Sequence, residues 1–242
     1  MGSLADLRGT RMRSLRRELR AARSSGVRIE LLDDAMDVDW SELESVNTQW
    51  LASRARRVEI KRATRRCPLE HEKHCTKLIA RDADGETIAW AAFDHLYSGG
   101  VLVGGGFSTV RYVPHAPPGV TALLAYDGVQ LLYAHAHEHH GTPVVHSPDD
   151  FVLALGESPM AETASLPSGP GVAPEDLSSR ARSGFLARLF RVLYRIGGRL
   201  YNTRGISEWK RKWRAPVQTP LYCAVEGRPP LRETVATMAL IL

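Results

Sequence analysis

The stretch VRYVPHAPPGVTALL, Val110–Leu124, connects a predicted strand to a predicted helix, and the rest of the fold is built around it. The strand is expected to end at Tyr112, because Pro114, Pro117 and Pro118 make the following residues a stiff turn. From Gly119 to His139, apolar residues recur at helical spacing. A strand, a short turn and a long helix in this order predict a sheet that is covered by helices.

Outward from this unit, helix and strand patterns follow one another along the chain, and DADG (Asp82–Gly85) is a hairpin signal between two strands. We expect helices over residues 11–25, 39–53, 119–139 and 179–201, and strands over 27–32, 76–82, 87–96, 99–112, 144–145, 151–155 and 221–225. The run Gly104, Gly105, Gly106 is expected to break the strand over 99–112. The predicted fold class is α/β (or α+β), with a mixed central sheet flanked by helices.

Length and composition favour a globular protein of the cytoplasm. The 242 residues suit one large domain or two small ones, and 43% hydrophobic with 24% charged residues is ordinary for such proteins. No apolar run is long enough to span a bilayer, and the first residues lack the apolar core of a secretory signal. Three cysteines are too few for a disulfide framework.

The net charge of +5 is concentrated in three basic blocks, at residues 8–28, 54–66 and 180–214. Blocks this one-sided indicate a polyanionic partner, either nucleic acid or an anionic membrane. A solvated arginine-rich surface is the alternative. In the helix expected over 179–201, apolar residues fall on one side and arginines on the other, which fits core packing as well as membrane contact.

Two histidine-rich stretches suggest a metal at first sight, but we expect none. In CPLEHEKHC (Cys67–Cys75) a second, separated pair of ligands is missing, and structural zinc sites usually need one. AHAHEHHG (Ala134–Gly141) lacks the H-E-x-x-H order of zinc proteases, and histidines are common at a helix C-terminus. No serine lies in a G-x-S-x-G turn either.

The turn before the helix at Gly119 also bears on the chemistry. Acetyl-CoA-dependent acyltransferases of the GNAT fold have a glycine-rich turn at this place, whose N–H groups hold the pyrophosphate. Here prolines, which donate no N–H, replace most of it. The turn therefore favours either a different acyl donor or a helix start with no site.

At this point the sequence resembles a known family. RYVPHAPPGVTALL, LALGESPM (Leu153–Met160) and YNTRGISEWKRKW (Tyr201–Trp213) resemble, in order and spacing, the C-terminal domain of bacterial phosphatidylglycerol lysyltransferases and related aminoacyl-tRNA-dependent transferases. Those domains read D-L-M-R-Y with a Pro-rich turn, then L-G-x-x-P-L, then Y-N-F-x-G-L-x-x-F-K-x-K-F. The resemblance covers about residues 11–226 and implies a GNAT-like fold.

The resemblance also implies a reaction. An amino acid esterified to the 3′ end of a tRNA passes to an acceptor hydroxyl or amine, of phosphatidylglycerol or of a small metabolite in natural-product biosynthesis. No cofactor is expected beyond aminoacyl-tRNA as co-substrate. The ester is already activated, so the enzyme has to position both partners and stabilise an oxyanion. Basic tracks suit the tRNA.

The motifs carry the family's site residues onto this chain. The catalytic residues implied are Arg111, Lys210, Lys212 and Tyr201. The substrate-binding residues expected are Ser108, Asn202, Gly205 and Gly156, with Glu157 and Glu59 as the nearest acids. The basic blocks, and not a motif, supply the expected tRNA-binding residues, Arg188, Arg191, Arg195, Arg204 and Arg211. One departure matters: Ser108 stands where the family has Asp, so Glu59 or Glu157 is expected to replace that acid.

The domain organisation expected is a disordered N-terminus over 1–10, a single transferase domain over 11–226 with a flexible loop at 161–178, and a tail over 227–242. Family members commonly have two GNAT-like halves, so a partner supplies the other half or the chain is a compact version. Expected partners are aminoacyl-tRNA and a lipid or small-molecule acceptor, with peripheral contact at the inner face of an anionic membrane as an extension. A CoA-dependent acyltransferase and a non-catalytic domain that binds tRNA or membrane are the alternatives.

Overall fold

The computed structural model describes residues 7–32, 39–54, 72, 74–139, 143–156 and 203–215. The chain divides into two compact units, Met1–Gly156 and Glu157–Leu242. The expected helix over 179–201, the strand over 221–225 and the loop over 161–178 lie outside the described residues. The single transferase domain over 11–226 stays a prediction.

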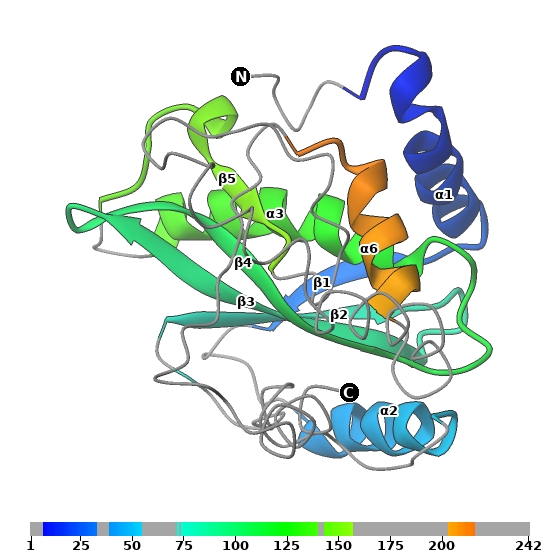
Figure 1. The fold of residues 1–242 in the computed structure, drawn as a ribbon. Coiled ribbons are helices and arrows are strands. Elements are labelled where there is room, and N and C mark those ends of the chain that lie inside the picture. Colours follow the sequence, from blue (N-terminus) through cyan, green and yellow to red (C-terminus); the bar gives the residue numbers. More distant parts are fainter. Residues whose placement is uncertain are drawn as a thin grey trace, which may run out of the picture. The chain divides into compact units, whose positions relative to one another are not determined.

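The first unit is built on a five-stranded sheet in the order β1-β2-β3-β4-β5 (Figure 1). The strands are β1 Arg28–Leu32, β2 Cys75–Arg81, β3 Thr87–Ser98, β4 Val101–Tyr112 and β5 Val152–Ala154. The first three pairings are antiparallel, whereas β5 runs parallel to β4. A parallel pair needs a crossover, and the helix α3, Val120–His139, supplies it.

Helices cover both faces of this sheet (Figure 1). α3 packs on β1 to β4, with α1, Arg13–Ser24, against it, and α2, Trp40–Ala52, packs on β3 and β4 from the opposite face. Short 3-10 helices, Thr10–Met12 and Pro148–Asp150, precede α1 and β5. This confirms the predicted α/β class with a mixed central sheet flanked by helices. No described helix is long and apolar enough to cross a membrane.

The glycine run does not break β4, contrary to the prediction. The strand continues from Val101 to Tyr112 through the three glycines. A Cβ on Gly104 would lie 2.2 Å from the carbonyl oxygen of Val152, and one on Gly105 would lie 2.7 Å from Leu132 Cδ2. The glycines therefore let β5 and α3 approach β4 closely. The strand expected at 144–145 is also wrong, because only an isolated bridge from Leu102 to Val144 forms there.

In the second unit the structure describes one helix, α6, Thr203–Lys212, where the sequence has its basic, tryptophan-containing stretch. Trp213, just after the helix, and Ser207 are buried, and the rings of Trp209 and Trp213 meet edge to face at 5.6 Å. The four-residue spacing of these tryptophans places them on one side of the helix.

Candidate functional site

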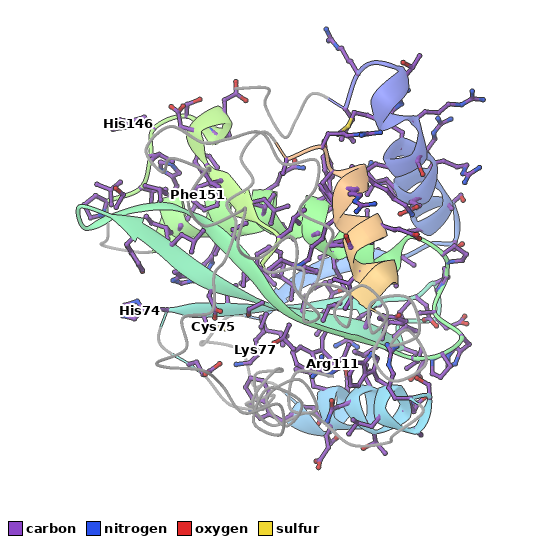
Figure 2. All side chains as sticks on the ribbon, in the orientation of Figure 1. His74, Cys75, Lys77, Arg111, His146 and Phe151 are labelled. Carbon is purple, nitrogen blue, oxygen red and sulfur yellow. The ribbon has the colours of Figure 1, made fainter. Side chains whose placement is uncertain are left out.

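Two buried cations lie on the face of the sheet that α2 covers. Arg111 on β4 and Lys77 on β2 are each only 4% exposed. Figure 2 shows both side chains between the sheet and α2. Because an isolated buried charge is costly, each of these two cations needs partners that compensate for its burial. Their contacts therefore define the site.

Arg111 is held by α2. Its guanidinium stacks on the ring of Trp50 at 3.9 Å, its Nε donates to Asn47 Oδ1 at 3.2 Å, and its Nη1 donates to the carbonyl of Val110 at 3.0 Å. A guanidinium on an indole face is a favourable cation–π arrangement, and Arg stacks better than Lys there. The site therefore presents a cation whose orientation is fixed by two residues of one helix.

The position of α2 follows from its sequence. Asp39 caps the helix by accepting from the N–H of Ser41, and hydrogen bonds from the Ser41 side chain and from this N–H lower the pKa of Asp39. Leu43 and Val46 are almost fully buried and face the sheet. Capping and burial together place Asn47 and Trp50, one turn further on, above Arg111.

A second guanidinium shares the same indole. Arg54, just after α2, lies 4.5 Å from the ring of Trp50 and donates to the hydroxyl of Tyr112 at 3.4 Å. Two cations therefore converge on Trp50, next to the strand that carries Arg111. This concentration of positive charge suits an anionic or carbonyl-containing ligand.

Lys77 has a different environment on the same face. Its Nζ lies 5.4 Å from the ring of Trp40, the first residue of α2, and 3.7 Å from Glu72 Oε2. Between Lys77 and Arg111, the buried indole N–H of Trp90 meets no acceptor in the part of the chain that the structure describes. The layer under α2 thus combines charge with aromatic surface.

Arg81 fixes the first turn of α2 to the sheet edge. It donates to Glu30 Oε2 and to Glu42 Oε2, both at 3.0 Å. Burial works against the charged form, but the two carboxylates outweigh it and raise the pKa of Arg81. The ion pairs therefore anchor α2 over the site without being part of it.

Ser108 lies on β4 at an irregularity in the sheet. Ala92 pairs with Thr109 and Phe93 with Phe107, so Ser108 is the extra residue of a bulge. Its exposed side chain donates to the carbonyl of Ala92 at 3.2 Å. Ser108, where the related family has Asp, therefore lies at a bulge that changes the local direction of β4, three residues before Arg111.

The Pro-rich turn leads directly into α3 and is closely covered by α1. Gly119 has φ +92, and a Cβ there would lie 2.1 Å from the carbonyl oxygen of Glu18 on α1. The N–H of Val120 is bonded to Pro117 O, and that of Ala116 to Val113 O. Backbone of α1 therefore packs directly against the start of α3 at Gly119.

The two lysines of α6 point in different directions. A helix turns about 100° per residue, so side chains two positions apart lie about 200° from each other. Lys210 lies between the two buried residues Ser207 and Trp213, three positions from each, whereas Lys212 lies four positions after the exposed Glu208. The two lysines of the motif therefore lie on different sides of α6, Lys210 toward Ser207 and Trp213 and Lys212 toward Glu208.

The remaining predicted residues divide into two groups. Gly156 is exposed with φ +68, Gly205 lies within α6, and Arg211 is exposed on α6. Arg204 also belongs to α6, but its side chain is outside the described residues, as are Tyr201, Asn202, Glu59, Glu157, Arg188, Arg191 and Arg195. Their roles stay predictions.

Sequence reasoning missed the residues that hold Arg111. Asn47 was not noticed, and Trp50 was assigned only to the apolar face of a helix. The contact joins residues 64 positions apart, which helical spacing alone does not indicate. Lys77 was missed because it looks like an ordinary strand residue. A second tryptophan, Trp40, at the start of α2 was the available signal.

A hollow of about 610 Å³ lies elsewhere, at the C-terminal end of α3. Its lining includes Val101, His137, Val145 and His146. Val101 and Arg111 are ten positions apart on β4, which corresponds to roughly 30 Å along a strand. The hollow is therefore separate from the cationic layer under α2, and it offers no group that continues that layer.

The fold is that of an α/β protein with a mixed sheet, and its buried cations Lys77 and Arg111 lie under α2. The profile of the family described as Phosphatidylglycerol lysyltransferase, C-terminal, matches residues 2–225. The chain belongs to this family, which is one of transferases, and the predicted resemblance is confirmed.

Solved structures with some similarity come from the same group. L-PGS from Bacillus licheniformis is 17% identical, with 60% of this chain and 44% of that chain covered and a TM-score of 0.44. The C-terminal domain of a putative lysylphosphatidylglycerol synthetase from Agrobacterium fabrum is 19% identical, with 88% and 54% covered and a TM-score of 0.47. The chain thus spans about half the length of these proteins. No protein of curated function matches it.

Proposed function

We propose that this chain is an aminoacyltransferase that moves an amino acid from aminoacyl-tRNA to a hydroxyl or amine acceptor. The acceptor oxygen or nitrogen attacks the ester carbonyl, the bond to the 3′ ribose oxygen breaks, and the acceptor's proton ends on that leaving oxygen. The family match over residues 2–225 carries the proposal, and the geometry around Arg111 supports it.

Arg111 suits the role of holding the ester or its developing oxyanion. Its guanidinium is fixed by Trp50 and Asn47 before any ligand arrives, so little reorganisation is needed at the moment of reaction. Arg54 next to the same indole adds positive charge. Lys210 is the second cation that we assign to the reaction, because it lies between the buried residues of α6.

The turn before α3 supports a donor other than CoA. A CoA pyrophosphate needs free N–H groups at the start of a helix. Here prolines remove donors, the N–H of Val120 is bonded within the turn, and the backbone of α1 covers Gly119. An aminoacyl ester on tRNA has no such requirement.

The outer face of α1 is suited to the tRNA. Arg13, Arg17 and Arg20 recur at helical spacing and are exposed, and within the described residues no carboxylate lies at ion-pair distance from them. The apolar face, with Leu15, Leu19 and Ala22, is buried, so α1 has no apolar surface left to insert into a bilayer. Guanidinium groups bind phosphates in a bidentate manner, which favours RNA as the occupant.

The acceptor follows from the family and not from the geometry. Phosphatidylglycerol is the first candidate and would bring the domain to the inner face of the membrane from the cytoplasm. A hydroxyl or amine of a small metabolite is the second. The lipid would attack through a hydroxyl oxygen and the metabolite through a hydroxyl oxygen or an amine nitrogen, and in each case the same ester carbonyl is attacked.

A transfer assay with tRNA charged with a labelled amino acid tests the proposal. The chain is incubated with vesicles that contain phosphatidylglycerol, or with a small-molecule extract, and acid-precipitable label is followed. Label should move from tRNA to the lipid or metabolite fraction, and Arg111→Ala should slow this. Label that stays on tRNA with every acceptor contradicts the proposal, and calorimetric binding of acetyl-CoA would favour a CoA-dependent enzyme instead.

A further inference from the structure

A cluster of ring nitrogens and a phenol lies at the end of the sheet where β2 begins. Tyr97 Oη is 3.1 Å from His74 Nδ1 and 3.4 Å from His95 Nδ1. The ring planes of His74 and His95 are inclined to that of Tyr97 by 85° and 65°. The rings therefore meet edge to face, and both imidazole Nδ1 atoms lie next to the Tyr97 hydroxyl.

The two separations that involve Tyr97 Oη are close to those between neighbouring ligands of one tetrahedral ion. Metal–nitrogen and metal–oxygen bonds of about 2.0–2.2 Å place neighbouring ligand atoms about 3.3–3.5 Å apart. The two distances to Tyr97 Oη are 3.1 and 3.4 Å. The three atoms also include two imidazole nitrogens, the donor type that Zn²⁺ and similar divalent transition metals prefer.

His95 has the second contact that metal-binding histidines usually show. Its Nε2 lies 2.8 Å from Thr76 Oγ1, on a side chain that is only 7% exposed. When Nε2–H donates to this hydroxyl, the lone pair of Nδ1 is directed at Tyr97. Thr76 thus fixes the ring and selects the tautomer that a metal ion requires.

His74 is held in an unusual backbone conformation. It has φ +66, which is rare for a residue with a side chain, and it directly precedes β2 (Figure 2). Such conformations persist where the surroundings enforce them, and they are concentrated at ligand sites. This is an observation separate from the distances, and it concerns the residue that completes the cluster.

Within the stretch CPLEHEKHC, a second, separated group of metal ligands is missing. The strand β3 supplies one, because His95 and Tyr97 lie beside His74. Within the described residues no three His, Cys, Asp or Glu side chains are grouped to hold a metal ion, so Tyr97 has to be the third donor. Cys75 and Asp94 belong to the other face by strand alternation.

We propose that His74, His95 and Tyr97 form a binding site for one divalent transition-metal ion of the Zn²⁺ type, with Thr76 as the positioning residue. Three protein donors leave a fourth position for water or a small ligand. The site is independent of the aminoacyl transfer, because Arg111 lies on the opposite face of the sheet. Hard cations such as Mg²⁺ prefer oxygen ligands and should not bind there.

Calorimetric titration of the chelator-treated full chain with ZnCl₂ tests the site. We expect one equivalent to bind, and His74→Ala and His95→Ala should each weaken binding at least about tenfold. Thr76→Val, which keeps the shape of the side chain, should weaken it by about 10–100-fold. His115→Ala, which removes an exposed histidine outside the cluster, should leave the affinity unchanged.

Thermal unfolding gives a second readout. Zn²⁺ should raise the midpoint of the wild-type protein, and His74→Ala should lose that rise, because an ion that binds only the folded state stabilises it. His74 is exposed, so this variant tests the site even if His95→Ala folds poorly. Absence of Zn²⁺ binding, equal affinity in His74→Ala, or binding that is lost on Cys67→Ser and retained in His95→Ala overturns the proposal.

Discussion

Arg111 shows how a single residue of this fold keeps a charge in a buried position. The indole of Trp50 lies on one face of the guanidinium, and the amide of Asn47 and a backbone carbonyl accept its hydrogen bonds. These contacts use the planar shape of the group as well as its charge. A substitution that keeps the charge of Arg111 but loses its planar group therefore tests the importance of that planar shape.

Arg111→Lys is expected to reduce the rate of aminoacyl transfer by about 10²–10³-fold, the usual effect of losing one oriented donor at a developing oxyanion. Lysine keeps the charge but has neither the flat surface for Trp50 nor the Nε donor for Asn47. Urea unfolding of the same variant is the control. Transfer by this variant at the wild-type rate would show that Arg111 does not stabilise the developing oxyanion.

The two lysines of α6 give the second prediction at this scale. Lys210→Ala should reduce the transfer rate by about a hundredfold, whereas Lys212→Ala should retain most of it, because Lys210 is three positions from both buried residues, Ser207 and Trp213, although both lysines are half-buried. The two variants make the same chemical change two positions apart, so each is the control for the other. Equal losses would show that the motif acts as a pair.

Individual residues were predictable only where a motif named them. Arg111 and Lys210 came from the family pattern, but their surroundings did not. The partners Asn47 and Trp50 belong to another element, and no local pattern links them to β4. The bulge at Ser108 was equally invisible, because strand register depends on the partner strand.

At the scale of elements, β4 depends on its glycines. Gly104→Ala should lower the free energy of unfolding by about 1–3 kcal/mol, because its Cβ would lie 2.2 Å from the backbone oxygen of Val152. Gly106→Ala should be nearly neutral, since the nearest atom to a Cβ there is at 3.6 Å. Urea unfolding measures both.

The two variants change the same residue type in the same strand, so a general effect of alanine in β4 cancels. Equal destabilisation would contradict the close contact between β4 and β5. The sequence located the glycines but suggested a broken strand, because the crossover that brings β5 and α3 against them is a tertiary feature.

The basic face of α1 gives a prediction about salt. Arg17→Ala should weaken tRNA binding and lower the slope of log K against log salt by about one unit, as expected for one lost phosphate contact. Arg23→Ala should change the slope less, because Arg23 already pairs with Asp127 at 2.6 Å. Filter binding over a range of salt concentrations measures both slopes, and equal slopes in the two variants would contradict this role for α1.

The helices and strands of the first unit were largely predictable. α1, α2 and α3 have clear apolar spacing, Asp39 marks a helix start, and DADG marks the hairpin between β2 and β3. The sheet order needed more than local patterns. That β5 runs parallel to β4 depends on α3 crossing one face of the sheet, which the strand–turn–helix at Val110–Leu124 only suggested.

For the whole molecule, two separate kinds of observation support the proposed reaction. The family match indicates a transferase, and the first unit holds an oriented, buried guanidinium on a sheet whose nearby helix start is Pro-rich and packed against α1. The basic outer face of α1 adds a surface for a polyanion. Together these features favour an activated ester on tRNA over a CoA thioester.

Transfer of label from charged tRNA, with wild type and Arg111→Ala compared side by side, tests the central claim most directly. The account predicts that the wild-type chain moves the amino acid to phosphatidylglycerol or a small-molecule acceptor, and that Arg111→Ala does so at least about a hundredfold more slowly while remaining folded. Label that stays on tRNA in both proteins, or moves equally fast in both, would contradict it.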